Sequence, residues 1–202
     1  SVNYVPKNLV VKINDDVSFD EACYTTIGSI AMQGIRQSKA TIGDTVAVIG
    51  LGLVGQLTSQ ILKASGCKVI GLDISEFPLK TALSNNLFSI DYGFNINEID
   101  VNKTFETITN GRGVDCVIIT AASDTNKPLL IAGDILRDRG CMVIVGSIQI
   151  SIPRSPFYEK EIDIKFSRSY GPGRYDSTYE EYGIDYPIGY VRWTERRNME
   201  SF

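Results

Sequence analysis

A glycine-rich turn between two buried strands constrains the fold of this chain more than any other feature. Residues 45–49 (TVAVI) form a short β-branched apolar run, typical of a buried parallel strand, and the G-x-G-x-x-G pattern of residues 50–55 follows directly. An amphipathic stretch and a second apolar run, residues 68–72, then lead to Asp73. This order predicts a strand, a glycine turn, a helix and a second strand ending on an acid, which is a dinucleotide-binding unit.

Each position in this unit has a physical role. Gly50 allows the tight turn, Gly52 lets a pyrophosphate approach the backbone, and Gly55 lets the helix pack close to the strand. The free N–H groups and positive dipole end of the helix would face the phosphates. Asp73 would accept hydrogen bonds from the adenosine ribose. A plain turn is the alternative for the glycine pattern considered alone.

Composition excludes several classes of function. The net charge of −4 argues against a nucleic-acid partner, and no apolar run approaches the roughly 18 residues of a membrane span. The first twenty residues lack a signal-peptide pattern, so we expect a cytoplasmic protein without a membrane partner. The four cysteines lie far apart and are expected to be small buried hydrophobes, with metal binding or disulfides as the alternative. The chain has no histidine, which removes imidazole as zinc ligand or general base.

Strand and helix patterns alternate after Asp73, which predicts an α/β fold. Further strands are expected at 88–92, 114–120, 141–146 and 162–166, and helices at 77–85, 101–110 and 127–136. Repeated units of this kind form a doubly wound parallel sheet with right-handed crossovers. We therefore expect a Rossmann fold with six parallel strands in the order 3-2-1-4-5-6.

Three segments are expected. Residues 1–40 read as a lead-in arm with helices, of which one begins at the capping box of Ser18 and Glu21 and a second spans 29–38. Residues 41–168 are the dinucleotide-binding domain. Residues 169–202 are an aromatic-rich tail in which acidic residues offset the arginines, so the tail is expected to pack on protein. Thr194 would cap a last helix, and the end at Phe202 reads as a boundary inside a longer polypeptide.

Several motifs together resemble the cofactor-binding half of the medium-chain dehydrogenase/reductase superfamily, which includes zinc-type alcohol, sorbitol and threonine dehydrogenases. They are GDTVAVIGLGLVGQ, GLDIS, GRGVDCVIITAAS, RGCMVIVGSIQ, EIDIKFS and the lead-in SFDEACYTTIGSIAMQGI, and they cover residues 5–168. The tail resembles two-part bacterial oxidoreductases in which an inositol-dehydrogenase-like domain follows.

The resemblance implies cofactor contacts along one edge of the sheet. They are Gly50, Gly52, Leu53, Val54 and Gly55 at the pyrophosphate, Asp73 at the ribose, Ile74 at the adenine, Thr120 and Ala121 at the middle of the cofactor, and Val145, Gly146 and Ser147 at the nicotinamide amide. A structural role in any such sheet is the alternative for the last five.

Zinc members of the superfamily carry most catalytic ligands and a proton relay on a barrel-like domain, of which this chain has no trace. One more ligand normally lies on the lead-in helix, near Thr26 or Ile27, and neither can bind zinc well. We therefore expect no zinc and no catalytic residue in these 202 residues, with a catalytic domain elsewhere in the same polypeptide.

The expected function is hydride transfer between a nicotinamide and an alcohol or carbonyl substrate held by that other domain. NAD is preferred to NADP because the Asp73 carboxylate would repel a 2′-phosphate and no arginine follows in residues 74–76. A non-enzymatic NAD(H)-sensing module and a methyltransferase are the alternatives. A short-chain dehydrogenase is excluded because the chain has no Tyr-x-x-x-Lys pair. A homodimer through the last strand, 162–166, is a further expectation.

Overall fold

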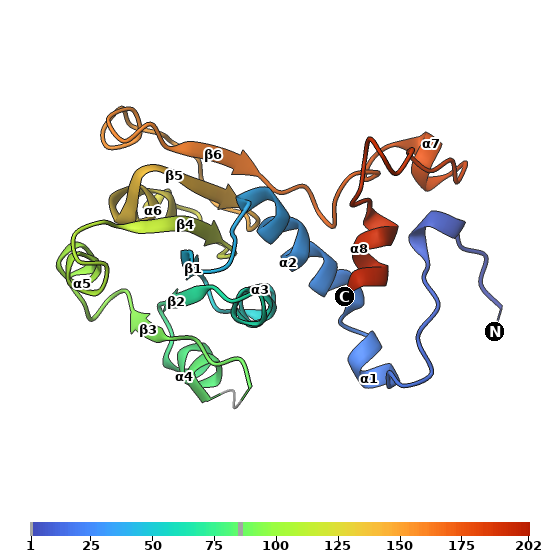
Figure 1. Cartoon of the computed structure of the whole chain (residues 1–202), viewed down its shortest axis with the longest axis horizontal. Coiled ribbons are helices and arrows are strands. Elements are labelled where there is room, and N and C mark those ends of the chain that lie inside the picture. The colour runs from blue at the N-terminus through green and yellow to red at the C-terminus, as the bar shows by residue number, and fades with distance from the viewer. Residues whose placement is uncertain (1, 85–86) are drawn as a thin grey trace. The chain divides into compact units, whose positions relative to one another are not determined.

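The structure is a computed structural model, and it describes residues 2–84 and 87–202 (Figure 1). The chain divides into two compact units. The sheet unit is Gly34–Phe166, and the terminal unit combines Ser1–Gln33 with Ser167–Phe202. The division into 1–40, 41–168 and 169–202 stays a prediction.

The helices are η1 (Lys7–Leu9), α1 (Phe19–Ala22), α2 (Thr25–Ser38), α3 (Leu53–Ala64), α4 (Glu76–Ser84), α5 (Val101–Ile108), α6 (Lys127–Ile135), α7 (Ser177–Glu180) and α8 (Glu195–Ser201). The strands are β1 (Thr45–Ile49), β2 (Lys68–Asp73), β3 (Tyr92–Asn95), β4 (Val114–Ile119), β5 (Leu136–Ile144) and β6 (Asp163–Phe166). In the described part of the chain, none of the helices has the length and apolarity needed to cross a lipid bilayer.

The six strands form one parallel sheet in the order β3-β2-β1-β4-β5-β6, which confirms the predicted Rossmann fold (Figure 1). β1 lies at the centre, between β2 and β4, and all its residues after Thr45 are buried. The chain order reverses beside β1, so the connections after β1 and after β4 run to opposite sides. Open sheets of this kind bind ligands in the crevice beyond that point.

Two apolar clusters cover the two faces of the sheet. Alternate strand residues point to opposite faces, so Ala47 and Ile49 enter one cluster while Val46 and Val48 enter the other. Residues of α5 and α6 complete the first cluster, and residues of α3 and α4 complete the second. The sheet is therefore covered on both faces, as its continuous apolar strands require.

The third strand lies later than the sequence predicts. The expected strand 88–92 was wrong, because the ladder to β2 runs from Tyr92 to Asn95. Ile90 packs into the apolar cluster with α3 and α4 instead. The Asp91 carboxylate accepts from the Val69 N–H at 2.6 Å and pairs with Lys63 at 2.9 Å. Asp91 therefore anchors the segment before β3 and is not part of the strand.

The fifth strand begins earlier than predicted. It runs from Leu136 rather than Cys141, and its register against β4 jumps from Val114–Leu136 to Cys116–Cys141. The charged residues between those pairs form an irregular excursion in which Arg139 has φ 56° and its N–H donates to the Lys160 carbonyl. The first residues of β5 are mostly charged, so a pattern of apolar residues cannot predict where this strand begins.

The terminal unit joins the two ends of the chain. The Asn8 side-chain amide donates to the Tyr179 carbonyl at 2.9 Å, and that of Asn198 donates to the Tyr170 carbonyl at 2.8 Å. Tyr179 is fully buried, so the aromatic tail does pack on protein. The predicted caps are present: Ser18 and Glu21 form a capping box on α1, and the Thr194 hydroxyl accepts from the third N–H of α8.

Candidate functional site

A cavity of about 440 Å³ lies at the carboxyl ends of β1, β2 and β4, at the edge where an open α/β sheet binds ligands. Its lining comes from the ends of β1 and β2, the glycine turn, Ile96 after β3, the loop after β4, and α6. The lining residues are Ile49, Gly50, Gly52, Asp73, Ile74, Ile96, Thr120, Ala121, Ala122, Ser123, Thr125, Lys127, Pro128 and Ile131.

Half of the residues predicted from the sequence line this cavity: Gly50, Gly52, Asp73, Ile74, Thr120 and Ala121. The other six lie nearby but outside the lining. Leu53, Val54 and Gly55 form the first turn of α3. Val145, Gly146 and Ser147 follow β5, and their backbone holds the neighbouring strand end: the N–H groups of Val145 and Gly146 both donate to the Ile119 carbonyl at 2.9 Å.

The glycine turn leaves space where a side chain would intrude. A Cβ on Gly52 would meet no other atom within 4 Å, so the backbone there is open to a ligand. A Cβ on Gly55 would lie only 1.9 Å from the Gly50 carbonyl oxygen. The glycine at this position therefore allows α3 to begin close to β1. Gly50 has φ 93° and touches Ala121, so both its conformation and its surroundings require glycine. The open cradle fits a pyrophosphate at the N-terminus of α3.

The carboxylate of Asp73 is tied to backbone on both oxygens. Oδ2 accepts from the Leu51 N–H at 2.6 Å, and Oδ1 accepts from the Ser75 N–H at 2.9 Å. These bonds fix the carboxylate at the rim of the cavity, in line with the end of β2. Each carboxylate oxygen can accept a second bond, so acceptor capacity for ribose hydroxyls remains.

Thr120 has a bracing role that the sequence did not reveal. Its hydroxyl donates to the Gly50 carbonyl at 2.5 Å, which couples the end of β4 to the glycine turn. Its neighbour Ala121 lies directly against Gly146, where a Cβ would come within 2.1 Å of the Ala121 carbonyl oxygen. The two strand ends therefore support the turn from one side.

The segment after β4 contributes lining residues that the sequence analysis did not single out: Ala122, Ser123 and Thr125 from the loop, and Lys127, Pro128 and Ile131 from α6. The Ser123 N–H donates to the Ser147 carbonyl at 2.9 Å, so the loops after β4 and β5 are joined. Among the described lining residues, Asp73 and Lys127 are the ionisable ones. The sequence signal that could have identified these residues is their position directly after a buried strand, at the edge where such sheets bind ligands.

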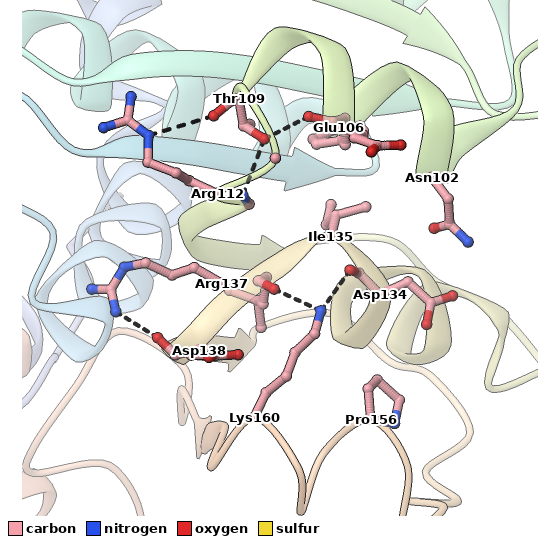
Figure 2. A pocket seen from close by; sticks show the side chains of 14 residues that line it. Asn102, Glu106, Thr109, Arg112, Asp134, Ile135, Arg137, Asp138, Pro156 and Lys160 are labelled. Carbon is pink, nitrogen blue, oxygen red and sulfur yellow. Dashed lines mark hydrogen bonds between the residues drawn. The ribbon is translucent and has the colours of Figure 1, made fainter.

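A larger cavity, of about 740 Å³, lies at the opposite edge of the sheet, where β4 and β5 begin (Figure 2). Figure 2 shows Lys160 reaching into it, and the Lys160 ammonium donates to the carbonyls of Gly133, Asp134 and Leu136 at 2.7–3.0 Å. Burial lowers the pKa of Lys160. The ammonium thus satisfies the free carbonyls at the end of α6. Lys160 therefore has a structural role in this cavity. The smaller cavity is the better candidate site.

The residues that the structure describes include no group of three or more Cys, Asp or Glu side chains placed to hold a metal ion. Thr26 and Ile27, near which the resemblance predicts a zinc ligand, lie in the first turn of α2.

Comparison with known proteins gives a consistent result. The family model described as zinc-binding dehydrogenase matches residues 54–183. Sorbitol dehydrogenase of Bacillus subtilis (strain 168) is 33% identical over 184 residues, which is 89% of this chain and 49% of that protein. The chain spans about half the length of the curated relatives it matches first.

Solved structures share the fold. Galactitol-1-phosphate dehydrogenase from Escherichia coli superposes with a TM-score of 0.72 at 19% identity, over 84% of this chain and 49% of that one. A dehydrogenase structure from Sinorhizobium meliloti 1021, which has NADP bound, gives a TM-score of 0.62 at 21% identity over 71% of this chain and 43% of that one.

Proposed function

This chain belongs to the zinc-binding dehydrogenase family, and we propose that its sheet unit binds NAD for an oxidoreductase of alcohols or polyols. The observation that carries the proposal is the grouping of an open glycine turn and a fixed carboxylate around one cavity. The two features are matched to the two parts of an adenosine diphosphate moiety: the turn to its phosphates and the carboxylate to its ribose.

The proposed contacts follow the cavity from end to end. Asp73 and Ile74 would hold the adenosine, and Gly50, Gly52 and the first turn of α3 would hold the pyrophosphate. The remaining predicted contacts lie farther along the edge: Thr120 and Ala121 beside the middle of the cofactor, and Val145, Gly146 and Ser147 toward the nicotinamide.

We prefer NAD to NADP on electrostatic grounds. A 2′-phosphate on the ribose would bring negative charge next to the Asp73 carboxylate, which the Leu51 and Ser75 N–H groups hold in place. The described cavity lining contains one cation, Lys127, and it lies at the start of α6 rather than at the end of β2. A site for the additional phosphate would need a cation at the end of β2.

When bound, the nicotinamide supplies the hydride acceptor or donor. The residues of this chain would bind the cofactor, orient it against the sheet edge and hold it there, while no catalytic residue is assigned within these 202 positions. The alcohol or carbonyl substrate, its catalytic groups and any zinc would come from a domain outside this chain. The lack of histidine and the identities of Thr26 and Ile27 support that assignment.

The substrate class rests on relatives. Sorbitol dehydrogenase is named for a polyol, and galactitol-1-phosphate dehydrogenase for a polyol phosphate. None of the relatives reported above is described as a regulator or a methyltransferase.

We also propose that two copies join through the exposed edge of β6, where Phe166 is 61% exposed, because an uncovered edge strand invites pairing.

Isothermal titration of the 202-residue chain tests the proposal, with NAD, NADH, NADP and S-adenosylmethionine as separate titrants. We expect NAD and NADH to bind and NADP to bind at least about tenfold more weakly, a difference of about 1.4 kcal/mol. Equal affinity for NADP would overturn the preference assigned to Asp73. Binding of S-adenosylmethionine alone would overturn the oxidoreductase assignment.

A further inference from the structure

Two cysteines lie side by side on adjacent strands of the sheet unit. Cys116 on β4 and Cys141 on β5 are direct partners in the parallel ladder. Parallel neighbours are spaced by about 4.8 Å, and disulfides form across Cα separations of about 4.4–6.8 Å. Both residues belong to the sheet face covered by α3 and α4, so their side chains share one side of the sheet. The ladder pairing thus places the two Cα atoms within the range that a disulfide spans.

A lysine completes the cluster. Lys165 on β6 is the ladder partner of Val143, and Cys141 is the partner of Asp163. Because residues two apart on a strand share a face, Lys165 lies on the same side as both thiols. Its ammonium donates to the Gln37 carbonyl at 3.2 Å, at the end of α2.

The surroundings favour a thiolate on Cys141 rather than on Cys116. The Cys116 thiol donates a hydrogen bond to the Cys141 sulfur and, with help from Lys165 and against burial and Asp163, lowers the pKa of Cys141 to about 7. The same bond, with burial, raises the pKa of Cys116, although Ser38 and Lys165 act in the opposite direction. Ionisation is therefore favoured on Cys141 over Cys116.

Exposure follows the same order. Cys141 is half-buried, whereas Cys116 is 2% exposed. A small oxidant can therefore reach Cys141 first, and Cys116 is positioned behind it. The other two cysteines differ: Cys23 is exposed, contrary to the expectation that all four are buried, and Cys67 is buried, which raises the pKa of its thiol.

We propose that Cys141 and Cys116 form a thiol–disulfide site that reacts with hydroperoxides. The Cys141 thiolate attacks one peroxide oxygen, the O–O bond breaks, and the leaving alkoxide or hydroxide takes up a proton, which leaves a sulfenic acid on Cys141. The Cys116 sulfur then attacks the sulfenic sulfur, and water leaves with the Cys116 proton. Cys116 and Cys141 are together oxidised by two electrons, and the peroxide is reduced by two. The inference does not depend on the proposed function.

Peptide mapping of the wild-type chain tests the site without any substitution. The chain is treated with limiting hydrogen peroxide, the remaining thiols are alkylated, and the protein is digested with trypsin without reduction. We expect the peptides that begin at Gly113 and Gly140 to appear joined, with two hydrogen atoms lost, while Cys67 stays alkylated. Oxidation that leaves Cys116 and Cys141 separately alkylated, or that stops at sulfinic acid on Cys141, would overturn the proposal.

Two variants test the electrostatic part. Alkylation of Cys141 with iodoacetamide, followed by mass spectrometry against pH, should have its midpoint near pH 7 in the wild type. Cys116→Ala and Lys165→Gln should each move that midpoint upward, by about one unit for Cys116→Ala, because each removes a group that stabilises the thiolate. Cys23→Ser is the matched control and should leave the midpoint unchanged. Thermal unfolding checks that each variant is folded, and unchanged midpoints in folded variants would contradict the assignment.

Discussion

The Asp73 carboxylate accepts a 2.6 Å hydrogen bond from the backbone N–H of Leu51, so the last residue of β2 holds the glycine turn that follows β1. Thr120 braces the same turn from the other side, through its bond to the Gly50 carbonyl. The acid at the end of β2 therefore supports the shape of the turn as well as the ligand site assigned to it.

Asp73→Asn separates these two roles. The asparagine oxygen can still accept from Leu51, but the negative charge and the bond from the Ser75 N–H are lost. We expect NAD affinity to fall by a few fold and the preference for NAD over NADP to shrink by about tenfold, or 1.4 kcal/mol. Isothermal titration with both cofactors measures the ratio. A ratio equal to that of the wild type would show that the charge plays no part in selectivity.

Gly52→Ala should impair binding without affecting folding. Its Cβ would meet no atom within 4 Å, and Gly52 has φ −65°, so alanine fits the folded chain. The methyl group would occupy the space assigned to the pyrophosphate, and we expect NAD affinity to fall by more than about tenfold. Gly189→Ala, also in open space, is the control and should change neither affinity nor melting temperature. Tight NAD binding by Gly52→Ala would place the phosphates elsewhere.

Gly55→Ala should destabilise the fold. Its Cβ would lie 1.9 Å from the Gly50 carbonyl oxygen, so α3 must move away from β1. Overpacking of this kind costs about 1–3 kcal/mol. Urea unfolding followed by circular dichroism measures the loss. Stability equal to that of the wild type would mean that the turn and helix are loosely packed.

Glu195 should make stability fall as pH rises. Its carboxylate is fully buried at the start of α8, and burial, assisted by Glu180 and opposed by Arg174 and Arg168, raises the pKa of Glu195 to about 7. The unfolded chain ionises near 4.5, so the folded state holds this proton more tightly between pH 4.5 and 7. The contribution to stability is complete below pH 4.5 and is lost as pH rises to 7, by at most about 3 kcal/mol.

Glu195→Gln removes that dependence because it keeps the shape and carries no charge. Melting temperatures at pH 5 and pH 8 provide the measurement. We expect the variant to gain stability over the wild type at pH 8 and to gain little at pH 5. Tyr170 and Tyr179 also face Glu195, but burial raises the pKa of each above 10, so they do not titrate in this range. A variant less stable than the wild type at pH 8 would contradict this account.

Lys160→Met should weaken the sheet unit without changing cofactor affinity. The substitution removes a charged donor from three carbonyls at the end of α6. Because Lys160 is partly exposed, we expect a loss of about 1–2 kcal/mol rather than the sum of three buried bonds. Lys160→Arg should retain part of the stability. The larger cavity lies at the opposite edge from Asp73, so an altered NAD affinity in the folded variant would point to a coupling between the two edges.

The sequence predicted the strand order because each central strand is an apolar run buried on both faces, and such runs are visible without knowledge of tertiary contacts. The sequence pattern placed β3 too early because Ile90 is apolar but packs outside the strand. Asp91, also outside the strand, accepts a hydrogen bond from the backbone of Val69. Asp73 and Gly52, both in the cavity lining, were identifiable by their spacing in the sequence. The bond from Thr120 to Gly50 and the reach of Lys160 to α6 join residues far apart in the chain, and no local pattern encodes them.

The terminal unit is assembled from both ends of the chain, with Asn8 bonded to Tyr179 across 171 positions. The sheet unit, by contrast, is one uninterrupted segment. During synthesis every residue of the sheet unit leaves the ribosome before Ser167–Phe202 does, so the sheet unit can fold while residues 2–33 still lack the rest of the terminal unit. Nascent chains stalled so that Phe166 has just left the ribosomal exit tunnel are expected to show protease resistance in the sheet unit, with residues 2–33 still cleavable.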